Sequence, residues 1–481
     1  MNRRMILYTL CIVMRVEAMF MAPALIIALV LGEKAAAYGF LLSMLLLLAA
    51  SVSTYFARPH KRVFYAREGF IIVALGWVSV SLFGALPFFF SGAVPNFIDC
   101  LFESVSGFTT TGASVLPDVE ALSKSLLYWR SFTHWLGGMG VLVFLLAIMP
   151  LSKNAGYSMH VLRAESPGPE VDKLTPRMRN SAVILYVMYV AMTVAQVLFL
   201  LAGGMSLFDS VTTAFGTAGT GGFGIMNDSM ASYSYYLQNV TTVFMILFGV
   251  NFNLYFFLLM RKFRKSWQNL EFWVYIGILA ASTVLITINV LPRFAGTRDA
   301  FHHASFQVAS IMTTTGYATT DFNLWPQFSR TLLMILMFFG ACAGSTAGGM
   351  KISRLVLLCK SFVRDLRQMV RPRSVPVVRM NGSLVASETI RGARSYLTVY
   401  FMVMLAAILL LSLNNLSMET TVTAVISCIN NVGPGLDAVG PMGNYGVFSG
   451  FSKLVLSAVM LIGRLEMFPM LMLLMPSAWK R

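Results

Sequence analysis

The sequence predicts an all-α polytopic membrane protein, and three observations lead to that prediction. The 481 residues are 57% hydrophobic and only 12% are charged, about half the charged share of an ordinary soluble domain. Several apolar runs are long enough to cross a bilayer. A stretch rich in glycine and threonine also recurs along the chain at intervals of roughly 100 residues, which indicates an internal repeat.

The long apolar runs are the predicted membrane spans, ten in all. They cover residues 5–31, 36–57, 69–91, 128–150, 180–202, 240–260, 271–291, 328–358, 394–414 and 450–475. The first run is expected to act as the insertion signal as well, because no small-residue cleavage site follows it. An even number of spans leaves both termini on the same side of the membrane.

Basic residues place that side in the cytoplasm. Most of the 36 Lys and Arg, which give a formal net charge of +16, lie in the termini and in loops 58–67, 153–179, 261–265 and 351–394. Cytoplasmic loops carry such an excess, whereas the opposite loops contain acids such as Glu103 and Asp437. A basic chain can also bind nucleic acid, but the regular alternation favours topology, and no nucleic-acid partner is expected.

From residue 69 onward the spans come in pairs, and each pair encloses a segment too short and polar to be a span. The four glycine-rich stretches lie in these segments, at 109–114, 216–224, 313–318 and 430–435, with Gly112, Gly221, Gly316 and Gly433 as their centres. A short helix is expected before each stretch. Its predicted N-caps are Asn96, Ser206, Thr297 or Asp299, and Ser417.

The sequence therefore predicts four tandem helix–pore-loop–helix repeats around a pseudo-fourfold pore, preceded by two extra transmembrane helices. The predicted units are the extension 1–67, repeat one at 68–152, a cytoplasmic loop at 153–179, repeat two at 180–265, repeat three at 266–360, a basic cytoplasmic loop at 361–393 and repeat four at 394–481.

This arrangement suits a cation path. Irregular backbone at membrane depth is tolerated only inside protein or beside water, and backbone carbonyls can replace the hydration shell of a cation. Glycine allows the turn that this requires, because it accepts positive φ. The predicted filter residues are Thr110, Thr111, Gly112, Ala113, Thr220, Gly221, Gly222, Thr314, Thr315, Gly316, Tyr317, Asn431, Val432, Gly433 and Pro434. The carbonyls expected to bind the ion are those of Thr110, Thr111, Thr220, Gly221, Thr314, Thr315, Asn431 and Val432.

The stretches VSGFTTTGAS (105–114), GTAGTGGFG (216–224) and INNVGPGL (429–436) resemble the Trk/Ktr/HKT superfamily of potassium transporters, and the resemblance covers the whole chain. It implies a location in the bacterial cytoplasmic (inner) membrane and potassium, with rubidium as its surrogate, as the transported ion. In this superfamily the four glycines set selectivity, and some plant members with Ser at the first position transport sodium. Gly112 therefore implies potassium. No organic cofactor is expected.

The run GACAGSTAGGMK (340–351) interrupts the second helix of repeat three. Its glycines could form a close helix-packing face, but its low helix propensity favours a break. The resemblance implies that Gly344, Ser345, Thr346, Ala347, Gly348 and Gly349 form an intramembrane gate.

Arg464 lies within an apolar run, where a charge is costly unless it faces water or a partner. The resemblance favours a pore position for Arg464 over a structural bond to Glu466 or a backbone carbonyl.

The resemblance also implies a homodimer in the lipid bilayer and a cytosolic nucleotide-binding regulatory subunit of the TrkA type. The basic residues 351–394 are the candidate docking surface for that subunit, and this chain has no nucleotide motif of its own.

Three alternatives stay open: a secondary transporter of another small solute, a non-selective or sodium-permeable relative, and a membrane enzyme. No catalytic set supports the enzyme. The sequence does not decide between channel-like flux and symport with protons or sodium.

Overall fold

The computed structural model describes residues 3–52, 66–140, 178–374 and 376–479. Residues 153–177 of the predicted cytoplasmic loop 153–179, and residues 141–150 of the predicted span 128–150, lie outside these residues. The described chain is almost entirely helical. Its strands are two short pairs, β1 (Phe339–Gly340) with β2 (Met350–Lys351), and β3 (Arg379–Met380) with β4 (Ser383–Leu384).

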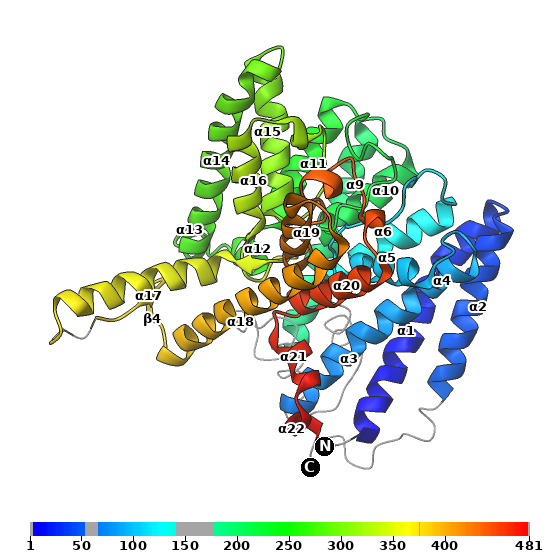
Figure 1. The fold of residues 1–481 in the computed structure, drawn as a ribbon, viewed down its shortest axis with the longest axis horizontal. Helices are drawn as coiled ribbons and strands as arrows, with labels where there is room; N and C mark the ends of the chain where they lie inside the picture. Colours follow the sequence, from blue (N-terminus) through cyan, green and yellow to red (C-terminus); the bar gives the residue numbers. More distant parts are fainter. Residues whose placement is uncertain (1–2, 53–65, 141–177, 375, 480–481) are drawn as a thin grey trace.

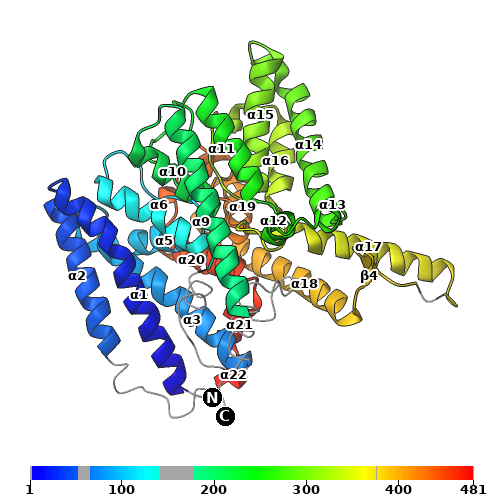
Figure 2. The ribbon, with the colours of Figure 1, turned by 180° about the vertical axis from the view of Figure 1, so that it is seen from behind.

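The N-terminal extension consists of α1 (Arg3–Val30) and α2 (Lys34–Ser51), which stand side by side at one edge of the molecule (Figure 1). α1 also packs against α3 (Ala66–Gly84) and α6 (Lys124–Gly138) of the following unit. The start of α1 and the end of α22 (Pro476–Trp479) lie at the same end of the molecule (Figures 1 and 2).

Each of the next four units contains a long helix, a short helix and a second helix. The long helices are α3, α9 (Met178–Ala202), α14 (Leu270–Val290) and α18 (Ser387–Leu411). The short helices are α5 (Phe97–Phe108), α10 (Leu207–Gly219), α15 (Thr297–Met312) and α19 (Met418–Asn430). The second helices are α6, α11 (Tyr235–Phe248), α16 (Gln327–Met337) and α20 (Gly450–Arg464). Outside this pattern are the short helices α4 (Leu86–Phe90), α12 (Phe252–Leu259), α13 (Phe263–Trp267) and α21 (Phe468–Leu474), and the longer α17 (Ile352–Val370).

Ten uninterrupted spans are not observed in the described chain. Six helices are long and apolar enough to cross a membrane, or seven if α11 and α12, bent by 89°, count as one. The predicted spans that fall short are the second helices of the four units, with 15, 14, 11 and 15 residues. Apolar composition alone did not predict where these helices end, and the sequence indicated a break only in the span 328–358, at residues 340–351.

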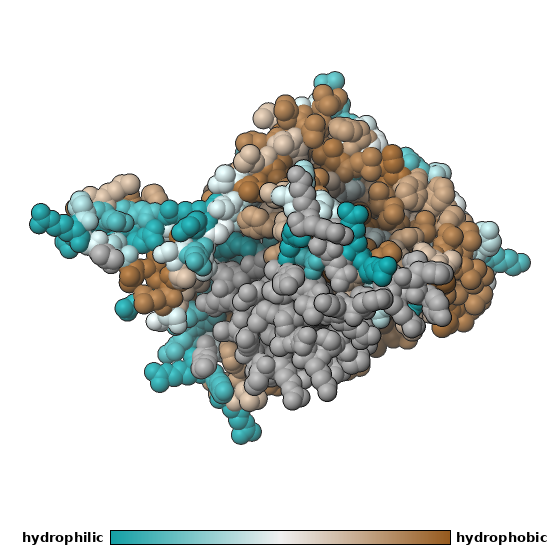
Figure 3. Space-filling view, turned by 90° about the horizontal axis from the view of Figure 1, so that it is seen from below, coloured by the Kyte–Doolittle hydropathy of each residue, from teal (hydrophilic) through white to brown (hydrophobic). Residues whose placement is uncertain are grey.

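Outward-facing apolar side chains mark the surface that meets lipid. Ile26, Leu198, Ile288 and Leu409, each from a different long helix, are at least 60% exposed. Leucine and isoleucine are usually buried in a protein, so such faces indicate a bilayer as the surrounding solvent. Figure 3, seen from below, shows apolar flanks and a hydrophilic arm, which contains α17.

Three of the predicted N-caps are observed. The side chains of Asn96, Ser206 and Ser417 accept hydrogen bonds from backbone N–H groups in the first turns of α5, α10 and α19. The prediction of Thr297 or Asp299 for the third short helix was wrong. α15 begins at Thr297 after Gly296, whose backbone is extended and which has no side chain to cap the helix.

Candidate ion-conducting site

The four glycine-rich stretches share one backbone turn at the end of the short helices. Thr110, Thr220, Thr314 and Asn431 have φ of 57°, 54°, 55° and 55°. Two residues later, Gly112, Gly222, Gly316 and Gly433 have φ of 79°, 70°, 86° and 101°. The common register corrects the sequence-based choice of Gly221 as the second centre. That residue precedes the positive-φ glycine, and the run of neighbouring glycines concealed the register. We call residues 110–113, 220–223, 314–317 and 431–434 segments 1 to 4.

Hydrogen bonds repeat in all four turns. The backbone N–H groups of Thr111, Gly221, Thr315 and Val432 donate to carbonyls five residues earlier, at 2.9, 2.9, 2.8 and 2.9 Å. Such a bond over a left-handed residue is the Schellman ending of a helix. Threonine is β-branched and rarely adopts this conformation, which costs about 1–3 kcal/mol per residue. Three strained threonines at equivalent places indicate that the turn serves a function.

The four segments form a closed ring. A Cβ added to Gly112 would lie 1.9 Å from the carbonyl oxygen of Gly221, and one added to Gly222 would lie 1.9 Å from that of Thr315. A Cβ on Gly316 would lie 2.3 Å from the Val432 oxygen. A Cβ on Gly433 would lie 2.6 Å from the Thr111 oxygen, which returns the circuit to segment 1. Each glycine is therefore required by the backbone of the next segment.

The residues of the ring whose carbonyl groups are the predicted ion ligands are buried. None of the eight carbonyls predicted to bind the ion accepts a hydrogen bond from a described residue. Buried carbonyls are normally paired. A pocket lined by Gly112, Gly222, Gly316 and Gly433 opens directly at the ring. Among the described residues, no three His, Cys, Asp or Glu lie together as metal ligands, so backbone oxygens are the groups available to a cation.

A buried ion pair supports segments 1 and 2. The Glu103 carboxylate accepts hydrogen bonds from Ser114 Oγ at 2.6 Å and Val115 N at 2.7 Å, and it pairs with Arg130 Nε at 3.1 Å. Arg130 also donates to the Gly224 carbonyl at 2.9 Å. The sequence analysis placed Glu103 in a loop opposite the cytoplasmic side, but it lies in α5, is 1% exposed and braces the backbone. Arg130, a charge within an apolar run, was the overlooked signal.

Further polar side chains brace the other segments. Ser310 Oγ donates to the Tyr317 carbonyl at 2.6 Å, and Ser427 Oγ donates to that of Gly433 at 2.7 Å. Asn431 Nδ2 donates to Thr111 Oγ1 at 2.9 Å and thereby joins segment 4 to segment 1.

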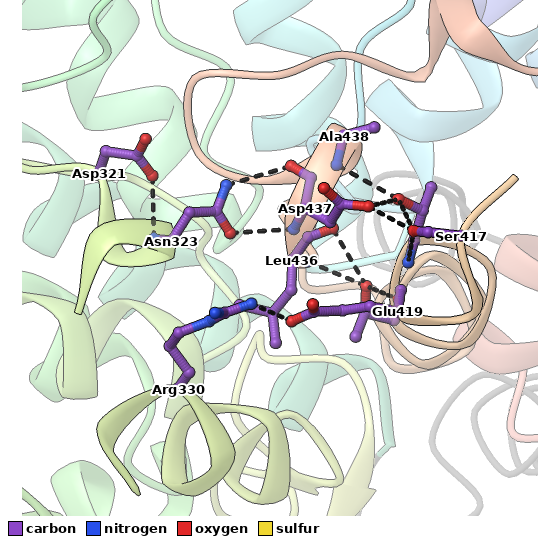
Figure 4. Close-up of polar contacts among 10 residues, drawn as sticks. Asp321, Asn323, Arg330, Ser417, Glu419, Leu436, Asp437 and Ala438 are labelled. Atoms are coloured by element: carbon purple, nitrogen blue, oxygen red, sulfur yellow. Dashed lines mark hydrogen bonds and ion pairs between the residues drawn. The ribbon is translucent and has the colours of Figure 1, made fainter. Parts of the chain in front are cut away.

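Loops beyond the ring are tied together in pairs. Asn323 Oδ1 accepts from the backbone N–H of Asp437 at 3.0 Å, and Asn323 Nδ2 donates to its carbonyl at 3.1 Å (Figure 4). Arg330 pairs with Glu419 nearby. Hydrogen bonds from Ser417 and Thr420 lower the pKa of the Asp437 carboxyl. In the other pair of loops, Asn227 Nδ2 donates to Asp118 at 2.8 Å and lowers the pKa of that carboxyl.

Residues 341–349 form an irregular loop on the other side of the ring. Its two ends are joined by the parallel pairing of Phe339 with Met350 and Gly340 with Lys351. The backbone N–H of Gly348 donates to Thr314 Oγ1 at 2.7 Å. A Cβ on Gly348 would lie 2.8 Å from the Cβ of Asn431, the first residue of segment 4. The loop, here named the inner loop, therefore contacts segments 3 and 4 directly.

The Arg464 side chain holds the inner loop by bonding to the backbone of the loop. Its guanidinium donates to the Thr346 carbonyl at 3.0 Å and to the Gly137 and Gly138 carbonyls, at the end of α6, at 2.7 and 3.0 Å. Arg464 thus lies beside the inner loop and also bonds backbone carbonyls, which the sequence analysis had treated as alternatives. Glu466 pairs with Arg354 instead.

Glu271 is a second support of the inner loop that the sequence analysis missed. One of its carboxylate oxygens accepts from the backbone N–H groups of Ala343 at 2.7 Å and Ser353 at 3.0 Å. An acid at the start of an apolar run was the available signal. The buried Lys351 adds a donor from the other end, because its ammonium lies against the carbonyls of Ala347 and Gly348.

Comparison with known proteins places this geometry in a family. The model of the family TrkH, described as "Cation transport protein", matches residues 36–480. The chain belongs to the TrkH family of cation transport proteins. The family consists of transporters, so the prediction that this chain is not an enzyme is confirmed.

Curated members of the TrkH family resemble this chain over most of its length. The Trk system potassium uptake protein TrkH of Vibrio parahaemolyticus is 35% identical over 474 residues, which cover 96% of each chain. The Trk system potassium uptake protein TrkG of Escherichia coli is 31% identical and covers 96% of this chain and 95% of its own. The crystal structure of the potassium transporter TrkH from Vibrio parahaemolyticus has a TM-score of 0.89 at 31% identity, with full coverage of both chains.

Proposed function

We propose that this chain takes up potassium across the bacterial cytoplasmic membrane through the ring of segments 1 to 4. The observation that carries the proposal is the ring itself, in which each positive-φ glycine lies against a carbonyl of the next segment. The eight carbonyls without protein donors supply the oxygens that would replace the hydration shell of the ion. The relatives named as potassium uptake proteins support potassium as the ion, with rubidium as its surrogate.

The short helices favour a cation in this ring. Each of the four ends at its segment, and a helix C-terminus carries about half a negative charge. Four such ends around one axis lower the energy of a positive ion and raise that of an anion. The four helix–loop–helix units then act as pore repeats, and α1 and α2 form the extension outside them.

The inner loop is proposed to gate this path. It lies against segments 3 and 4, and Arg464, Glu271 and Lys351 hold it there through backbone atoms. Release of these bonds would let the loop leave the inner side of the ring. Gly344, Ser345, Thr346, Ala347, Gly348 and Gly349 would then be the moving residues.

The remaining proposals concern assembly. The basic surface 351–394, with both termini, faces the cytoplasm, and α17 extends away from the body as an arm (Figure 1). This arm is the proposed docking site for a TrkA-type nucleotide-binding subunit, and the functional unit is a homodimer. Loss of co-purification after charge reversal at Arg367 and Arg371, compared with reversal at Arg3 and Arg4, tests the docking site.

Rubidium flux into liposomes containing the purified protein tests the proposed function. Competition by potassium, but not by sodium or lithium, is the expected result. Equal competition by sodium would replace potassium selectivity with a non-selective path. If the intact protein shows no flux, a variant with the inner loop shortened at 344–349 separates a closed gate from a wrong function. Flux in that variant supports a closed gate, and its absence contradicts the proposal.

A further inference from the structure

Segment 2 differs from segments 1 and 3 at two equivalent positions. At segments 1 and 3, the threonine directly before the segment and the threonine at its second position form a hydroxyl pair. The pairs are Thr109 with Thr111 and Thr313 with Thr315, each at 2.8 Å. The register of the ring places Gly219 and Gly221 at the same two positions of segment 2. The second segment therefore lacks the hydroxyl pair and has no side chain of its own there.

His134 of α6 fills the space that these side chains would occupy. A Cβ added to Gly221 would lie 2.4 Å from both Cγ and Nδ1 of the imidazole. A Cβ added to Gly219 would lie 2.2 Å from the carbonyl oxygen of His134. The His134 side chain is fully buried. The imidazole and a side chain at Gly221 are thus mutually exclusive in this structure, whereas a side chain at Gly219 is excluded by the backbone of α6.

The imidazole also makes two hydrogen bonds of defined direction. Its Nδ1 lies 2.7 Å from the Gly107 carbonyl oxygen in the last turn of α5, and its Nε2 lies 3.2 Å from the backbone nitrogen of Phe223. A carbonyl can only accept and a backbone N–H can only donate, so Nδ1 carries the proton and Nε2 accepts. The ring of Phe223 packs on the imidazole at 4.1 Å between centroids.

We infer that His134 is a positioning residue for the ring: it replaces the threonine pair in segment 2 and thereby sets ion discrimination there. It fixes segment 2 on both sides of Gly222, by packing against Gly221 and by bonding Phe223. The Gly221 carbonyl in turn lies against Gly112, so a shift of segment 2 reaches segment 1. This inference rests on the proposed function of the ring.

Two substitutions separate the volume of His134 from its hydrogen bonds. His134→Gln keeps a donor and an acceptor, whereas His134→Met keeps a similar volume but can make neither bond. We expect His134→Gln to retain the potassium-over-sodium discrimination of the wild type in the rubidium flux assay. We expect His134→Met to lower it by roughly tenfold, since two hydrogen bonds are lost. Thermal unfolding in detergent identifies any variant that fails to fold.

A double variant tests the steric part of the inference. Gly221→Ala alone should lower discrimination at least as much as His134→Met, because the new Cβ meets the imidazole. His134→Ala removes the imidazole, so Gly221→Ala in that background should lower discrimination less than it does in the wild type. Equal effects in both backgrounds would overturn the steric exclusion.

Gly112→Ser distinguishes failure of this inference from failure of the proposed function. If the wild type prefers potassium and Gly112→Ser loses that preference, the ring is the filter. Unchanged discrimination in His134→Met would then overturn the role of His134 alone. A wild-type protein without potassium preference would overturn the proposed function itself.

Discussion

The ring and the inner loop are both irregular, glycine-rich backbone enclosed by helices, yet they are held in different ways. The ring closes through contacts between backbone atoms of successive segments, and each turn repeats the same hydrogen bond. The inner loop occurs once, and much of its support comes from side chains: Arg464, Glu271, Thr314 and Lys351.

This difference separates a fixed element from a movable one. Backbone carbonyls packed against glycines cannot shift without moving a neighbouring segment. Side-chain hydrogen bonds contribute about 0.5–1.5 kcal/mol each, or about 1.5–3 when a charge is involved, and water can replace them. A few such bonds can be exchanged at a moderate free-energy cost. We therefore expect substitutions in the ring to change which ion passes, and substitutions at the loop to change how often it passes.

Gly112→Ser should have the largest effect on discrimination. Its Cβ would lie 1.9 Å from the Gly221 carbonyl oxygen, and φ is +79°, so the new side chain adds both strain and a clash. We expect the potassium preference over sodium in the rubidium competition assay to fall by about tenfold or more. Gly204→Ala is the matched control, because φ is +83° but nothing lies within 4 Å. Equal losses in the two variants would mean that backbone strain alone, not ring closure, matters.

Removal of residues 344–349, or Arg464→Met, should raise basal flux while leaving ion discrimination unchanged. Arg464→Met removes three charge-assisted hydrogen bonds to backbone carbonyls. The equilibrium between the blocking and the open position of the inner loop should therefore shift toward the open position by at least about tenfold. Arg261→Met, in the exposed connection between α12 and α13, is the control. A deletion variant that folds but conducts no faster would show that the loop packs helices and does not gate.

Thr314→Val tests the point where the two regions meet. Valine keeps the shape of threonine but removes the hydroxyl that accepts from Gly348 N. We expect basal flux to rise by a few-fold, in line with one neutral hydrogen bond of about 1 kcal/mol. Thr220→Val, at the equivalent position of segment 2, serves as the control, because the Thr220 hydroxyl donates to the carbonyl of its own neighbour Gly219. A change of discrimination without a change of flux would place this hydroxyl with the ring instead.

Substitution of Asp437, in one of the paired loops beyond the ring, should have the smallest effect of these variants. Hydrogen bonds from Ser417 and Thr420 hold its folded-state pKa below the ordinary value, so its contribution to stability is present above the unfolded pKa. That contribution is lost as the pH falls through the folded pKa. Asp437→Asn should lower the melting temperature slightly at pH 7, and the difference from the wild type should vanish under acidic conditions. A difference independent of pH would exclude the carboxylate as its source.

Several features of the backbone were predicted from local sequence rules. The spacing of the glycines located all four turns, and the N-caps Asn96, Ser206 and Ser417 followed from ordinary capping preference. Where a local rule had several solutions, it failed. Gly221 and Gly222 are indistinguishable in sequence, and only backbone φ separates them. Glu103 was assigned to a loop because its partner Arg130 lies 27 residues away and no local pattern joins the two.

By itself the sequence determined a helical membrane protein with four similar glycine-rich turns and an interrupted helix at 340–351, because hydropathy, helix propensity and glycine are local properties of the chain. Only the tertiary structure decided that each glycine adjoins the next segment, that Arg464 bonds the inner loop, and that the His134 imidazole takes the place of a side chain at Gly221. These contacts join residues dozens to hundreds of positions apart. Their geometry depends on how whole helices pack, which no local pattern specifies.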